Sequence, residues 1–158
     1  MMRVGVISDT HLRSYDRDLA KKLAEHFKDV QMILHAGDIT ELSVLDMLEA
    51  PQVIAVLGNM DGFAAAQSLP AKRELKLEGF QIGLIHGYGP PNGLEERVRR
   101  EFDDVDAIVF GHSHKPTNYL LNGLLYFNPG SAAGGRGHPK TVGMLTLGDS
   151  ISGEIIEI

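Results

Sequence analysis

The sequence predicts an α/β protein made of two mixed β-sheets that pack face to face, with helices on the outside. Three observations support this. The first third alternates apolar strands with amphipathic helices, an order that implies parallel strands and right-handed crossovers. The second half contains strands paired across tight turns, which predicts antiparallel neighbours. The length of 158 residues suits one domain, residues 1–158.

The first third is expected to form three strands and two helices. The first helix has Leu19, Leu23 and Phe27 on one face. Thr40 is the expected N-cap of the second helix. The predicted order is strand 3–8, helix 18–27, strand 31–35, helix 41–48 and strand 52–57.

The second half is expected to form two hairpins around a helix, followed by a closing hairpin. Strands 74–78 and 80–85 meet near Gly79. Asn122-Gly123 is a strong signal for a type I′ turn between strands 119–121 and 124–127. The other expected elements are helix 94–102, strand 107–110 and the closing strands 142–147 and 151–158.

The composition narrows the classes of site and partner. The chain has no cysteine, which excludes disulfides and thiolate metal ligands and fits a reducing cytoplasm, so we expect a cytoplasmic protein. Residues 1–8 resemble a strand and not a signal peptide. No apolar run approaches the ~20 residues that span a bilayer. The net charge of −6 argues against nucleic-acid binding.

Polar side chains follow five of the expected strands, each in a loop that contains glycine or another polar residue. Ligands of α/β sheets bind outside the carboxyl ends of the strands, so these loops are expected to converge at one edge. The side chains are Asp9, His11, Asp38, Asn59, His86, His112 and His114.

These seven side chains are suitable metal ligands. Two Asp, one Asn and four His supply hard oxygen and borderline nitrogen donors. Seven groups exceed the needs of one tetrahedral ion but suit two ions that share a bridge. Any one of these short polar segments after a strand is common in ordinary turns. Five of them, each at the end of an expected strand, argue for one shared site. Of the other histidines, His26 is expected on a solvated helix face and His35 in the core or behind a ligand.

As an ordered set, these motifs resemble those of the calcineurin-like metallophosphoesterase superfamily, and most closely its small microbial branch of YfcE-like phosphodiesterases. The similarity covers the chain from Asp9-Thr10-His11 to Asn128-Pro129-Gly130-Ser131. It implies a four-layer αββα sandwich, with two divalent metal ions and a bridging water or hydroxide that attacks a phosphate ester.

The resemblance also implies the role of each ligand. Asp9, His11 and His114 would bind the first ion, and Asn59, His86 and His112 the second, with Asp38 bridging them. Asp38, Asn59 and His86 are thereby the expected catalytic residues. Two such ions can activate a water and offset the charge of in-line displacement. Manganese is the ion that we expect first, although nickel, iron and zinc accept the same donors.

One position departs from the pattern of many superfamily phosphatases, which carry a histidine after the motif asparagine to protonate the leaving group. This chain has Met60 there, and a thioether cannot donate a proton. We therefore expect modest activity, biased toward leaving groups that need little protonation. His138 is an alternative acid. Arg136 and His138 are candidate substrate contacts, and Asp61 is either a support for a ligand histidine or a loop cap.

Several alternatives stay open at this stage. The substrate is expected to be a small-molecule phosphodiester, although a phosphomonoester would suit the same site. The fold also resembles a retromer scaffold subunit that binds proteins without catalysis, but here no ligand side chain is lost. A mononuclear or structural metal site is a third alternative. An exposed sheet edge would allow a homo-oligomer.

Overall fold

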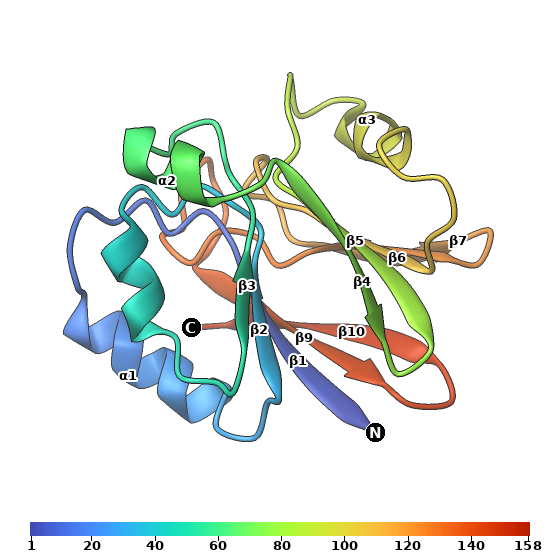
Figure 1. Cartoon of the computed structure of the whole chain (residues 1–158), viewed down its shortest axis with the longest axis horizontal. Helices are drawn as coiled ribbons and strands as arrows, with labels where there is room; N and C mark the ends of the chain where they lie inside the picture. The colour runs from blue at the N-terminus through green and yellow to red at the C-terminus, as the bar shows by residue number, and fades with distance from the viewer.

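The protein, described by a computed structural model of residues 1–158, contains two five-stranded sheets that face each other (Figure 1). The first sheet has the strand order β10-β9-β1-β2-β3, and β1, β2 and β3 are parallel as the alternating pattern predicts. Its strands are β1 (Met2–Ile7), β2 (Met32–His35), β3 (Val53–Ala55), β9 (Thr141–Leu147) and β10 (Ile151–Glu157).

The second sheet has the order β4-β5-β6-β8-β7, with a parallel centre and an antiparallel strand at each edge. Both predicted hairpins are confirmed, with left-handed backbone at Glu78-Gly79 and Asn122-Gly123. The strands are β4 (Lys72–Leu77), β5 (Phe80–Ile85), β6 (Ala107–Val109), β7 (Thr117–Leu121) and β8 (Leu124–Asn128).

Helices cover the outer faces of both sheets, which gives the four layers (Figure 1). One apolar core joins α1 (Arg17–His26) and the 3₁₀ helix η1 (Leu42–Met47) to the first sheet. A second core lies between the sheets, and a third joins α3 (Leu94–Arg99) to the second sheet. The expected αββα sandwich is thus confirmed. No helix has the length and apolar character needed to cross a membrane.

Three local features differ from the sequence prediction. Residues 41–48 form the 3₁₀ helix η1 in place of an α-helix, and Glu41, not Thr40, precedes it. Thr40 has a φ of 77°, which an N-cap does not adopt. The short helix α2 (Phe63–Ser68) was not predicted, because only Ala65 of its six residues is buried and it therefore has no apolar periodicity.

Phe127 of β8 packs against glycines of the opposite sheet. Its ring is fully buried in the core between the sheets. A Cβ atom added to Gly143 of β9 or Gly153 of β10 would lie 2.5 Å from its ring carbons. The absence of a side chain at these two positions therefore lets the sheets close over the ring.

We predict that Gly143→Ala lowers the free energy of unfolding by about 1–3 kcal/mol, because the new methyl group overpacks a filled core. Urea unfolding would measure this. Gly148→Ala is the matched control, since its Cβ would meet only Met1, at 3.9 Å. Phe127→Leu in the Gly143→Ala background should recover part of the loss. Equal effects of the two alanine variants would contradict the packing argument.

Candidate metal centre

The seven side chains singled out in the sequence all lie at one edge of the sandwich. Each follows the carboxyl end of one of the strands β1, β2, β3, β5 and β6, whose parallel arrangement brings the loops to the same edge. The contacts between them divide into two groups that share carboxylates.

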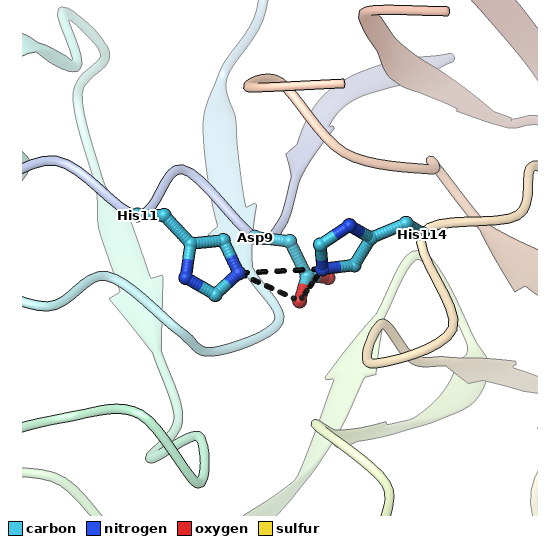
Figure 2. Close-up of side chains that lie close together, drawn as sticks. All are labelled: Asp9, His11 and His114. Atoms are coloured by element: carbon cyan, nitrogen blue, oxygen red, sulfur yellow. Dashed lines mark hydrogen bonds and ion pairs between the residues drawn. The ribbon is translucent and has the colours of Figure 1, made fainter. Parts of the chain in front are cut away.

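The first group consists of Asp9, His11 and His114 (Figure 2). The Nε2 atoms of the two imidazoles are 3.3 Å apart. Asp9 Oδ1 lies 3.2 Å from His114 Nε2 and 3.6 Å from His11 Nε2. Three donor atoms from two distant loops thus face one point.

The second group is centred on His86. Its Nε2 atom lies 3.3 Å from Asp38 Oδ2 and 2.9 Å from Asn59 Oδ1. His112 Nδ1 lies 3.1 Å from the same Asn59 oxygen. The four side chains come from the loops after β2, β3, β5 and β6.

Two carboxylates lie between the groups. Asp38 Oδ2 is 3.5 Å from His11 Nε2 in the first group and 3.3 Å from His86 Nε2 in the second. Asp9 Oδ1 reaches the second group as well, at 3.9 Å from His86 Nε2. Asp9 therefore belongs to both possible ligand sets, a position that sequence reasoning gave to Asp38 alone.

These distances fit the chemistry of a bound cation. Donors that each lie ~2.1 Å from one ion are roughly 3.0–3.4 Å apart, close to the separations within each group. Asp9 Oδ1 is buried and accepts no hydrogen bond. An unpaired buried carboxylate oxygen is costly, and a cation would satisfy it. The residues present therefore suit divalent metal ions.

The histidines of the second group are oriented by backbone carbonyls. His86 Nδ1 lies 2.7 Å from the carbonyl oxygen of Ala36, and His112 Nε2 lies 2.8 Å from that of Gly89. Each nitrogen donates its proton to the carbonyl, so in the neutral ring the other nitrogen carries a lone pair. That lone pair faces the shared space beside Asn59, which is the orientation of a metal ligand.

The buried charges perturb one another strongly. Burial alone would raise the pKa of Asp9, but the close imidazoles of His11 and His114 and the charge of His86 hold that pKa well below its usual range. Burial likewise opposes ionisation of Asp38, while His86 lowers its pKa. The pKa of His11 is raised by Asp9. Both carboxylates are thus ionised and ready to bind cations at neutral pH.

The backbone of this edge is strained. Nine residues of the chain other than glycine have a positive φ, and five of the seven candidate ligands are among them. Side chains with a Cβ rarely adopt this conformation, and such strain collects at functional sites. The candidate ligands with positive φ are Asp9, His11, Asp38, His112 and His114.

Two glycines allow the loops to touch. A Cβ atom on Gly58, just before Asn59, would lie 2.1 Å from the backbone nitrogen of Asp38. One on Gly111, just before His112, would lie 2.0 Å from Ser8 Oγ. No other residue fits at either position. These glycines therefore allow the loop of Asn59 to contact that of Asp38, and the loop of His112 to contact that of Asp9.

Hydrogen bonds to Asp9 and Asp61 hold the loops in place. Asp9 Oδ2 accepts from the Ser8 hydroxyl at 2.7 Å and from the His112 backbone N–H at 3.0 Å. The two oxygens of Asp61 accept from the backbone N–H groups of Thr40 and Gly58, each at 2.7 Å. Asp61 therefore caps loops, which decides between its two interpretations. The role of Ser8 had no sequence signal, because a serine directly after a buried strand is common and its partners lie in the folded loops.

His35 lies behind the ligands, fully buried and without charge. Its Nδ1 atom accepts from the backbone N–H of Gly37 at 3.2 Å, so its Nε2–H donates to Thr10 Oγ1 at 3.1 Å. Burial lowers the pKa of His35 to about 3. The ring supports the loop that carries Asp38 and does not face the centre itself.

The two candidate substrate contacts lie in the same exposed loop. Arg136 Nη1 donates to the backbone carbonyl of His112 at 3.1 Å, which places the guanidinium at the rim of the centre. His138 pairs through its backbone with Gly135, and no hydrogen bond joins its ring to a ligand. Met60 is 59% exposed, and its N–H donates to Asp38 Oδ1 at 2.8 Å.

Residues 2–150 match the model of the calcineurin-like phosphoesterase superfamily domain. The chain belongs to this family. A probable metallophosphoesterase of Methanocaldococcus jannaschii is 37% identical over 99% of this chain and 82% of its own length. A phosphodiesterase of the same organism is 26% identical over 91% of this chain and 92% of its own length. Both the family model and the first of these relatives thus place the chain among the metallophosphoesterases by similarity.

One solved structure of similar fold contains a bound metal ion. It is Vps29 of Entamoeba histolytica complexed with Zn²⁺, with a TM-score of 0.73 and 25% identity, and each chain covers 99% of the other. A fold like this one thus binds a divalent metal in that protein.

We predict that His35 makes the metal-free protein acid-sensitive. Its pKa is about 6.5 in the unfolded chain and about 3 when folded, so the unfolded state binds the extra proton between these values. Stability should therefore fall as pH falls through this window, by up to about 1.4 kcal/mol per pH unit from this residue.

His35→Asn, which keeps an acceptor for the Gly37 N–H, should flatten the dependence of unfolding free energy on pH by up to one proton. Urea unfolding of metal-free protein between pH 3 and 6.5 measures the slope. His26→Asn, at the end of α1, is the control and should keep the wild-type slope. An unchanged slope in His35→Asn would show that the ring is not held neutral.

Proposed function

We propose that this chain is a phosphodiesterase that acts through two divalent metal ions. Asp9, His11 and His114 would bind one ion, and Asn59, His86 and His112 the other, with Asp38 shared. One observation carries the proposal: two groups of donors face each other across carboxylates, with neighbouring donor atoms 2.9–3.9 Å apart. Manganese is the ion that we expect first, in a cytoplasmic enzyme.

The chain's own residues would position the substrate and the charges. When bound, the two ions would activate a water and neutralise the phosphate in an in-line displacement. His86 and His112 are held by backbone carbonyls, so their free nitrogens need no reorganisation. Asn59 lies between these rings with its side-chain oxygen. Ionised Asp9 and Asp38 supply the negative charge that retains the ions.

A contact from Arg136 to a phosphate oxygen is part of the proposal. Arg136 is exposed, and its guanidinium lies next to the backbone carbonyl of His112. It is the only cation of the glycine-rich loop 134–138 apart from any protonated His138. Arginine recognises phosphate oxygens through paired donors. His138 of the same loop would contact the substrate or supply the proton of the leaving group.

The diester preference rests on Met60 and on the similarity to an archaeal phosphodiesterase. Met60 stands beside Asn59, exposed at the rim, and offers no proton to a leaving group. When the leaving alcohol of a small organic diester is acidic, it departs as a stable anion and needs no such proton. A monoesterase using the same centre is the alternative, and rates on matched mono- and diesters with two equivalents of Mn²⁺ decide between them.

A non-enzymatic protein-binding scaffold is a second candidate function. The likeness to Vps29 favours it, as do the exposed apolar side chains of Met60 and Tyr88 in loops that follow strand ends and of Phe63 at the start of α2. The complete set of seven ligands favours catalysis. Two bound metal ions without turnover on any phosphoester would establish the scaffold in place of the enzyme.

We predict that Asp38→Asn weakens both metal sites, because one carboxylate serves both groups. Metal analysis after Mn²⁺ loading should fall from two ions to fewer than one per chain. The rate on an aryl phosphodiester should fall by at least about 100-fold, since the ions together supply several kcal/mol. Asp46→Asn, the same change at an exposed residue of η1, is the control. Full metal content in Asp38→Asn would refute the shared role.

We predict a steep dependence of rate on the pKa of the leaving alcohol. Aryl diesters should react much faster than alkyl diesters, because no acid stands at position 60. Met60→His should raise the rate on alkyl diesters by about 10²–10⁴-fold and change the aryl rate little. Met60→Gln controls for size and polarity. Equal wild-type rates on aryl and alkyl substrates would show that another residue protonates the leaving group.

A further inference from the structure

Strand β7 forms an unprotected edge of the second sheet. It pairs with β8 on one side only and ends the strand order there. Three consecutive apolar side chains are exposed on it: Tyr119 by 41%, Leu120 by 65% and Leu121 by 52%. Because successive side chains point to opposite faces, the strand is apolar and exposed on both faces. Soluble proteins rarely leave such an edge open.

The other three sheet edges carry the protection that β7 lacks. Strand β3 is only three residues long, and Arg73 reaches across to the carbonyl of Ala55 at 3.3 Å. Charged side chains on an edge strand oppose pairing with another chain. Such residues are Lys72, Arg73, Glu74 and Lys76 on β4, and Glu154 and Glu157 on β10. Residues 117–121 contain no charge at all.

The hydrogen-bonding pattern of the hairpin shows which groups of β7 are unpaired. The two-residue turn makes Leu121 part of a hydrogen-bonded pair with β8, and by alternation Tyr119 and Thr117 also bond to β8. The backbone N–H and C=O of Asn118 and Leu120 therefore point away from β8. Four strong backbone groups are thus directed outward from the edge.

We infer that β7 pairs with β7 of a second copy of this chain, antiparallel and about a two-fold axis at Tyr119. This register is the one in which Asn118 of each copy faces Leu120 of the other. All four outward backbone groups then find partners across the axis, and the two sheets become one of ten strands. A two-fold contact requires a self-complementary patch, and this strand provides one.

The side chains fit the same register. Tyr119 already stacks on Tyr126 of β8, with ring centroids 5.1 Å apart and planes 15° from parallel. Tyr119 would face its counterpart in the non-hydrogen-bonded pair, where side chains approach most closely. A row of four tyrosines would then cross the joined sheet. Five residues per copy make a small contact, so we expect a concentration-dependent dimer.

Cysteine crosslinking tests the register, because the chain has no cysteine of its own. Facing Cα atoms in a non-hydrogen-bonded pair are ~4.5 Å apart, within the ~4.4–6.8 Å span of a disulfide. Tyr119→Cys should therefore form a covalent dimer on mild oxidation at micromolar protein. Leu121→Cys is the matched control on the same strand and face. Its two copies would be ~13 Å apart and should not crosslink.

Sedimentation of the wild-type protein tests the dimer itself. The average mass should rise with concentration, and Leu120→Lys should keep the protein monomeric over the same range. Phe63→Lys, at a residue that is 79% exposed on α2, is the control and should still dimerise. Circular dichroism and metal content should match the wild type in each variant, since none of these residues lies among the candidate ligands.

Three outcomes would overturn the inference. One is a wild-type protein that stays monomeric at all concentrations, which would mean that β7 pairs with a different protein or stays unpaired. Another is a dimer that survives Leu120→Lys, which would place the contact elsewhere. The third is crosslinking by Leu121→Cys with none by Tyr119→Cys. None of these outcomes bears on whether the protein hydrolyses phosphoesters.

Discussion

The buried carboxylate of Asp9 is the group on which the arrangement of the site depends. Its backbone N–H donates to Gly37 at 3.0 Å, its carbonyl accepts from Ser131 at 2.8 Å, and Oδ2 accepts from Ser8 and His112. Loops after four strands are thereby tied to one residue. The remaining oxygen is left free among imidazoles, so the same contacts that hold the loops also create a demand for a cation.

The backbone conformation and the close charges of the loops destabilise the fold, and the packing of the two sheets offsets this free energy. Left-handed backbone at residues such as Asp9 and Asp38 is unfavourable, and two like charges lie near each other. The three apolar cores hold the strand ends in place, so the loops keep this conformation. Gly58 and Gly111 allow contacts that any side chain would block. The free energy of core packing thus holds the charged, strained loops in a conformation that can bind ligands.

The features predicted well from sequence are those with a local physical cause. The turn at Asn122-Gly123 needs residues that tolerate positive φ, so its residue types identify it. The parallel order of β1, β2 and β3 followed from alternating strands and helices. Helix α2 was missed because a short exposed segment has little apolar periodicity, and the 3₁₀ form of η1 was missed because apolar spacing over six residues does not separate it from an α-helix. The roles of Ser8 and Asp61 depend on contacts with distant loops, which no local pattern encodes.

The sequence by itself determined the types of the donor groups and their place after strand ends, since residue type and strand pattern are local properties. It also determined the family, through the ordered set of motifs. Only the tertiary structure decided that Asp9 is shared with Asp38, that His35 is neutral, and that β7 is an open sheet edge with exposed apolar side chains. Distance, burial and exposure arise from segments far apart in the chain, so they exist only once it has folded.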